Sequence, residues 1–129
     1  MARLRLALVV VLTAAVLAGC DRYADDIDAV KTAESIIPGR SNDLVVIDIA
    51  GARGTVEWRG GPAPQYESPD IVGVQAVIKR IGAGGKRSEV ELDFVHNRQT
   101  KKVAFDGLLV DGEKQSLVGA IGQFLMQFK

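Results

Sequence analysis

The chain is poor in the residues that carry most metal-binding and catalytic chemistry. Its 129 residues include one cysteine, Cys20, and one histidine, His96. A single cysteine cannot close a disulfide within the chain, and a structural zinc site draws on about four Cys or His ligands. We therefore expect no disulfide, no metal and no cofactor.

An excess of either charge is also missing. The chain has 16 basic and 16 acidic residues, and two of the basic ones, Arg3 and Arg5, precede the first acid, Asp21. Residues 20–129 therefore carry 14 basic and 16 acidic residues, a net charge of −2. Because a nucleic-acid-binding domain needs a basic face, we expect no nucleic-acid partner.

Long apolar runs are absent, apart from one short run near the start. Between Leu6 and Leu17 only Thr13 is polar, which gives an apolar run of 12 residues after Arg3 and Arg5. A membrane-spanning helix needs roughly 20 such residues, whereas a secretory signal needs about 7–15 after a positively charged start. The length of the run favours an export signal over a membrane span.

The apolar run ends in the sequence Leu17-Ala18-Gly19-Cys20. An aliphatic residue, two small residues and a cysteine resemble the lipobox of bacterial lipoproteins. The resemblance implies cleavage of residues 1–19, a thioether-linked diacylglycerol on Cys20, and an acyl chain such as palmitate on the new amino terminus. Several acyl chains would anchor the protein stably, since each buried methylene contributes about 0.8 kcal/mol. The alternative is an ordinary signal followed by a buried free cysteine.

Asp21 follows the lipidated position and resembles the residue that retains lipoproteins of enteric bacteria at the inner membrane. We expect a lipid-anchored protein on the periplasmic side of the cell envelope, with the inner membrane favoured over the outer. The alternative is that Asp21 simply begins an acidic tether. In either case we expect residues 20–23 to form a short lipid-proximal tether. Residues 20–129 have the length of a single domain.

A helix is predicted over residues 21–37, where apolar side chains recur at helical spacing before Pro38-Gly39. Its acidic residues Asp25, Asp26 and Asp28 suit the positive end of the helix dipole, and we expect them to be solvated.

The next segment, residues 41–51, is ambiguous between helix and strand. Ser41 and Gly51 would cap a helix, whereas the β-branched residues between them favour a strand. We favour a short helix, because residues 51–54 offer poor hairpin chemistry.

An antiparallel meander of three to four strands is predicted from residue 55 onward. Residues 55–59 alternate, with Val56 and Trp58 on one face, and further strands are expected over residues 71–81, 87–95 and 101–110. Two turns set the register, and both place alternate residues of the middle strand against apolar partners. The predicted pairs are Ile78–Val90, Ala76–Leu92, Val74–Phe94 and Lys79–Glu89 in the first hairpin, and Phe94–Val103 and Leu92–Phe105 in the second.

The last segment, residues 113–129, has apolar residues at helical spacing, namely Leu117, Ile121, Phe124, Leu125 and Phe128. It predicts a C-terminal amphipathic helix packed on the sheet. Only Lys114 and Lys129 are basic in this segment, which disfavours a membrane-surface helix.

His96 is the one residue that could act as a general base, at the end of the strand that carries Leu92 and Phe94. A base also needs a nucleophile and an orienting acid, and Asp93 lies on the opposite face of the strand. The acidic row Glu89, Glu91 and Asp93 is typical of the solvated face of an antiparallel sheet. We therefore assign no catalytic residue.

The Gly/Pro-rich loop over residues 60–70 is the best candidate for recognition. It carries Tyr66 and begins beside Trp58, and aromatic residues near loops on a rigid scaffold are common recognition devices. The candidate binding residues are therefore Trp58, Tyr66 and His96, although Trp58 also shares a face with Val56 and would suit the core.

The mature domain loosely resembles small exported bacterial lipoproteins of unknown function, through an initial helix followed by "VEW" and "VELDFVHNRQTKKVAF". A helix on an antiparallel meander is also similar to cystatin-like domains, as a fold analogy only. The predicted fold class is α+β, with an N-terminal helix, the meander and a C-terminal helix.

The predicted function is a non-catalytic, lipid-anchored module that binds another envelope protein and the membrane through its acyl chains. Two alternatives remain. One is a carrier of a small apolar ligand, which requires a cavity lined by Trp58, Phe94, Phe105 and Phe124. The other is a small hydrolase centred on His96, which requires a cleft with a serine or carboxylate within hydrogen-bond reach.

Overall fold

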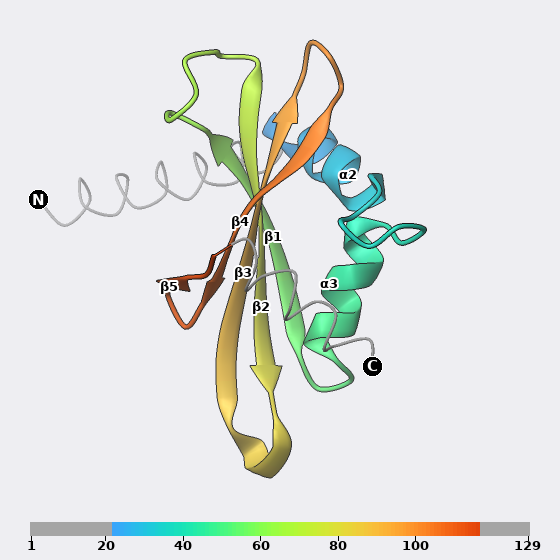
Figure 1. The fold of residues 1–129 in the computed structure, drawn as a ribbon, viewed down its shortest axis with the longest axis vertical. Helices are drawn as coiled ribbons and strands as arrows, with labels where there is room; N and C mark the ends of the chain where they lie inside the picture. The colour runs from blue at the N-terminus through green and yellow to red at the C-terminus, as the bar shows by residue number, and fades with distance from the viewer. Residues whose placement is uncertain (1–21, 117–129) are drawn as a thin grey trace, which may run out of the picture.

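A computed structural model describes residues 22–116, which form one antiparallel sheet with two short helices on one side (Figure 1). No helix among these residues is long and apolar enough to cross a membrane. The elements are α2 (Ala24–Thr32), α3 (Asn42–Ala50), β1 (Thr55–Pro62), β2 (Ile71–Ile81), the 3₁₀ turn η1 (Ala83–Gly85), β3 (Arg87–Asn97), β4 (Val103–Val110) and β5 (Glu113–Lys114).

The strands pair in chain order, β1-β2-β3-β4-β5, so the predicted meander is present with an additional strand at its far edge. The predicted register of the β2–β3 hairpin is confirmed. Because side chains alternate between the two faces, that register turns one set of apolar residues toward the helices. The confirmed pairs are Val74–Phe94, Ala76–Leu92, Ile78–Val90 and Lys79–Glu89.

The predicted register of the β3–β4 hairpin is wrong by two residues. Val103 lies opposite His96, and Phe105 lies opposite Phe94. The turn falls two residues later than predicted, between Asn97 and Val103. There the Asn97 side-chain oxygen accepts hydrogen bonds from the backbone N–H groups of Gln99 and Thr100, and Lys101 adopts a left-handed conformation with φ 66°. A shift of two residues preserves the face of each side chain, so Val103 and Phe105 still face the core.

A β-bulge then interrupts β4. Asp93 pairs with Gly107 and Phe94 with Phe105, so Asp106 is the extra residue. Beyond the bulge, Leu108 lies opposite Leu92. The bulge therefore lets both Phe105 and Leu108 face the helices, although they are three positions apart.

The predicted short helix over residues 41–51 is confirmed as α3, with the Ser41 hydroxyl accepting a hydrogen bond from the Leu44 backbone N–H. Gly51 ends the helix at φ 72°, a backbone conformation that favours glycine.

The predicted helix over residues 21–37 is too long, because α2 ends at Thr32. Ala33 is extended, and its carbonyl accepts a hydrogen bond from the Asn42 backbone N–H. The buried Asn42 side chain also donates to the Val30 carbonyl at 2.9 Å. These bonds to α3 satisfy groups that further turns of helix would have used.

The core lies between the two helices and one face of the sheet. A single buried cluster joins residues of α2 and α3 to β2, β3 and β4. Its members are Val30, Val45, Val46, Ile49, Ala50, Val74, Ala76, Ile78, Val90, Leu92, Phe94 and Leu108.

The predicted fold class is wrong as stated. The sheet has five strands rather than three to four, and a C-terminal helix packed on it is not part of the described structure. Asp111 and Gly112 have φ values of 50° and 83°, which make a tight hairpin turn, so Glu113 and Lys114 form β5 where the helix was expected to begin. The rest of that prediction, residues 117–129, lies outside the described residues.

Candidate functional site

Trp58 packs against the core rather than projecting from the neighbouring loop. It is half-buried on β1, and its ring centroid lies 6.1 Å from that of Phe94. Phe94 in turn meets Phe105 edge to face at 5.8 Å. On its outer side, the Lys31 ammonium lies 5.8 Å from the indole centroid, so α2 partly covers the ring.

His96 belongs to a buried ionic cluster that joins the sheet to α2. Its Nδ1 lies 2.8 Å from Oδ1 of Asp26, and because a carboxylate only accepts, the imidazole donates this hydrogen bond. Arg98 donates to the same carboxylate through Nε at 3.1 Å and through a terminal nitrogen at 2.7 Å. Asp26 and His96 are 2% and 5% exposed, so most of the cluster is shielded from water.

The carboxyl of Asp26 is held in its charged form by these neighbours. Burial raises its pKa, but the hydrogen bonds and positive charge of Arg98, together with those of His96, outweigh burial and hold the pKa below its usual 3.8. The prediction that Asp26 is solvated is therefore wrong. Its spacing of four residues from Val30 places both on one helix face, and this was the sequence signal for burial.

The cluster supplies one requirement of the hydrolase alternative, a carboxylate within reach of His96, but not the other, which is a cleft that holds His96. Neither His96 nor Asp26 lines any of the three cavities described below, and the hydrogen bond described for the His96 side chain goes to Asp26. The arrangement is that of a structural ion-pair cluster.

Tyr66 holds the 63–70 loop against the sheet. Its hydroxyl donates to Oδ1 of Asp106, the bulge residue of β4, at 2.7 Å, and this bond raises the pKa of Tyr66 above 10.0. The loop lines a cavity of about 440 Å³ together with Tyr23 and Arg98. The structure thus brings Tyr66 to the same cavity as Arg98, a member of the His96 cluster. Trp58 does not line this cavity.

A second cavity, of about 330 Å³, opens on the polar face of the sheet beside Asp93. Burial, a hydrogen bond with Glu91 and the negative charges of Glu91 and Asp106 together raise the pKa of Asp93 to about 7, with burial the largest cause. Asp93 therefore differs from a solvated carboxylate, which is how the acidic row was interpreted from sequence. Its position opposite Gly107, which has no side chain, could be found only once the bulge was known.

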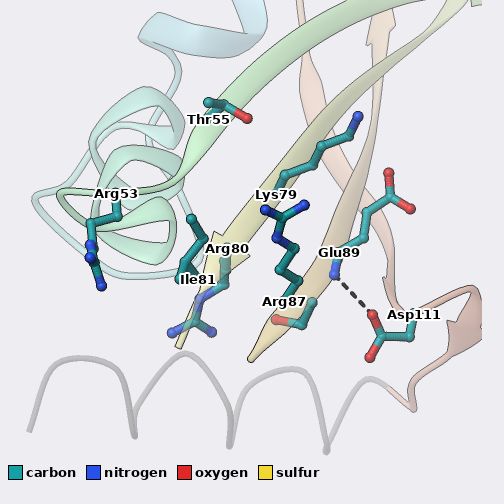
Figure 2. A pocket seen from close by; sticks show the side chains of 9 residues that line it. Arg53, Thr55, Lys79, Arg80, Ile81, Arg87, Glu89 and Asp111 are labelled. Atoms are coloured by element: carbon teal, nitrogen blue, oxygen red, sulfur yellow. Dashed lines mark hydrogen bonds between the residues drawn. The ribbon is translucent and has the colours of Figure 1, made fainter. Parts of the chain in front are cut away.

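The largest of the three cavities, about 520 Å³, lies where β2 and β3 approach the hairpin turn (Figure 2). Four cationic side chains line it, with two acids and three other residues, and we call it the basic cavity. Figure 2 shows Lys79 and Arg87 over the paired strands, with Arg80 extending the other way past the end of β2. The lining residues are Arg53, Thr55, Lys79, Arg80, Ile81, Arg87, Ser88, Glu89 and Asp111.

The register explains why these cations gather at one place. Thr55, Lys79 and Glu89 stand side by side on one face of β1, β2 and β3. Arg87, two residues before Glu89, is the diagonal neighbour of Lys79 on that face. Sequence reasoning missed this cavity, because Lys79 was considered only as the partner of Glu89.

Within residues 22–116 no group of three or more His, Cys, Asp or Glu side chains is arranged to hold a metal ion. Comparison of the chain with protein-family models, with curated proteins and with solved structures finds no match.

Proposed function

We propose that this protein is a lipid-anchored lipoprotein of the bacterial cell envelope that binds a partner protein at the end of the sheet away from its anchor. The apolar run over residues 6–17 and the lipobox-like sequence ending at Cys20 support lipidation. Asp21 supports retention on the periplasmic side of the inner membrane.

The observation that carries the proposal is the placement of the first described residues and the basic cavity at opposite ends of the sheet. Arg98, in the β3–β4 turn, donates to the backbone carbonyl of Arg22, so α2 begins at that end (Figure 1). The basic cavity lies at the other end, beside the β2–β3 turn. Ten residue steps along β2 separate the two ends by about 33 Å.

This separation has a direct consequence for a chain anchored through Cys20. Arg22 is two residues from the lipid, so the 63–70 loop and the β3–β4 turn lie near the bilayer. The β2–β3 turn then extends into the aqueous compartment, where a protein partner can reach the basic cavity.

The packing of the core disfavours the ligand-carrier alternative. That alternative needs space around Trp58, Phe94 and Phe105, but these rings lie against one another. Phe94 is 3% exposed, and Val46, Val74 and Ile78 of the same cluster are fully buried. The fourth expected lining residue, Phe124, lies outside the described residues.

Site-specific photocrosslinking of the full-length protein in its native envelope tests the proposal. A photoreactive phenylalanine derivative replaces Lys86, an exposed residue at the β2–β3 turn, and in a matched variant replaces Gln65, an exposed residue of the 63–70 loop. We expect a discrete protein adduct from position 86 and not from position 65. Absence of a protein adduct at position 86, or one at position 65 alone, would contradict the proposal.

A further inference from the structure

We propose that the basic cavity recognises an acidic peptide segment of the partner, with carboxylates seated at Lys79 and Arg87 and an apolar side chain at Ile81. This inference rests on the proposed function and names the chemistry of its partner. The cavity volume of about 520 Å³ is in the range that accommodates a few side chains.

The basic cavity has positive charges that are not neutralised by ion pairs within the described part of the chain. Arg53, Lys79 and Arg87 take part in none of the four ion pairs found among residues 22–116. Lys79 and Glu89 are direct cross-strand neighbours, yet they form no ion pair there. All three cationic residues are exposed, so they can be neutralised by a ligand without first breaking an ion pair of the described fold.

The acidic residues of the basic cavity determine which class of anion can bind there. Glu89 and Asp111 line the same cavity, and the Asp111 carboxylate is already held by the Glu89 backbone N–H at 2.9 Å. These negative charges oppose a densely charged phosphate polymer more strongly than a peptide, whose carboxylates carry one charge each and are spaced along the chain. A glutamate can lie at Arg87 in bidentate geometry while its neighbours avoid Glu89.

The side chain of Ile81 gives the basic cavity an apolar surface. Ile81 is 39% exposed, and it lies opposite Arg87 in the last pair of the β2–β3 ladder. An apolar surface between cations gives a peptide both an anchoring contact and a charge contact. A free phosphate or a sugar phosphate would leave this surface unused.

The test measures peptide binding to the full-length protein in lipid nanodiscs. The probe is a fluorescent octapeptide of alternating glutamate and leucine, and the same peptide with glutamine in place of glutamate is the control ligand. We expect at least tenfold tighter binding of the glutamate peptide at 50 mM salt, with affinity falling at 200 mM salt because exposed charges are screened.

Two double variants locate the binding. Lys79→Gln with Arg87→Gln should weaken binding at least tenfold. Lys101→Asn with Lys102→Gln removes the same charge from the opposite end and should change affinity less than twofold; asparagine tolerates the left-handed backbone at position 101. Equal weakening by both variants, equal binding of the two peptides, or tighter binding of inorganic polyphosphate than of the glutamate peptide would overturn the inference.

Different results would contradict the proposed function and the recognition of an acidic peptide. Lack of a protein adduct at position 86 contradicts the function itself. A protein adduct that persists undiminished when Lys79→Gln and Arg87→Gln are introduced leaves the function in place and contradicts recognition by these charges.

Discussion

The imidazole Nδ1 of His96 and the carboxylate Oδ1 of Asp26 lie 2.8 Å apart, although the two residues are 70 positions apart in the chain. This hydrogen bond joins α2 to the end of the central strand β3. With Arg98, it replaces water around a carboxylate that is almost fully buried. The histidine is therefore a structural residue of the fold.

Replacing Asp26 with asparagine should destabilise the domain. The change leaves His96 and Arg98 without their anionic partner, and removal of one member of a buried ion pair costs about 3 kcal/mol. Urea unfolding followed by tryptophan fluorescence measures the effect. Asp28→Asn, at an exposed position of the same helix, is the control and should shift the unfolding free energy by about 0.5 kcal/mol or less. Equal effects of the two changes would show that the cluster contributes no stability.

Asp93 should make the domain less stable as the pH rises from about 4 to about 7. Its pKa is raised from 3.8 to about 7 in the folded state, so the folded protein binds a proton there that the unfolded chain has released. That difference disfavours folding progressively through this range and is complete above pH 7. Asp93→Asn should remove this pH dependence and be more stable than the wild type at pH 8. An NMR titration of the Asp93 carboxyl carbon with a midpoint near 4 would contradict this prediction.

The pH dependence of stability that Asp26 contributes has the opposite sign. Its folded-state pKa is lowered, so the stability it contributes is present above the unfolded value of 3.8 and is lost as the pH falls below it. In the Asp93→Asn background, thermal unfolding between pH 5 and pH 2 should therefore show a loss of stability that Asp26→Asn reduces.

Cys20→Ser should release the protein from membranes and abolish its labelling by radioactive palmitate, since the hydroxyl cannot form the thioether. Fractionation of cells into soluble and membrane pools measures the first effect. Unchanged membrane retention of the variant would contradict lipid anchoring, and sucrose-gradient separation of the wild type tests the inner-membrane expectation.

Two adjacent glycines of β1 should respond differently to alanine. A Cβ at Gly60 would lie 2.3 Å from the Cβ of Tyr23, whereas a Cβ at Gly61, on the opposite face, would have no neighbour within 4 Å. Gly60→Ala should therefore cost about 1–3 kcal/mol, because the start of α2 must move. Gly61→Ala should be close to neutral. The same measurement of urea unfolding compares them, and equal losses would show that Tyr23 does not pack there.

The parts of the fold that depend on local alternation could be predicted from sequence. Val90, Leu92 and Phe94 fixed the β2–β3 register, because a one-residue slip would expose all three. The β3–β4 turn was misjudged because its position depends on the Asn97 side chain and on the left-handed Lys101. The end of α2 was misjudged because Asn42, from the next helix, supplies the competing hydrogen bonds.

The His96 cluster and the basic cavity were less predictable, because their residues come together only when the sheet forms. Asp26 was interpreted from its acidic neighbours, whereas its environment is set by His96 and Arg98. Likewise, Lys79 and Arg87 become neighbours only through the hairpin, and nothing in either strand alone identifies a cavity between them.

The bulge at Asp106 also bears on how copies of the protein behave toward one another. A strand near the edge of a sheet offers backbone hydrogen-bonding groups to other chains, and uninterrupted ladders promote aggregation. Among the described residues β5 pairs with β4 over only two positions, and Asp106 breaks the ladder geometry just before them. An extra, charged residue that aligns Phe105 and Leu108 with the core therefore also hinders the addition of a strand from a second molecule.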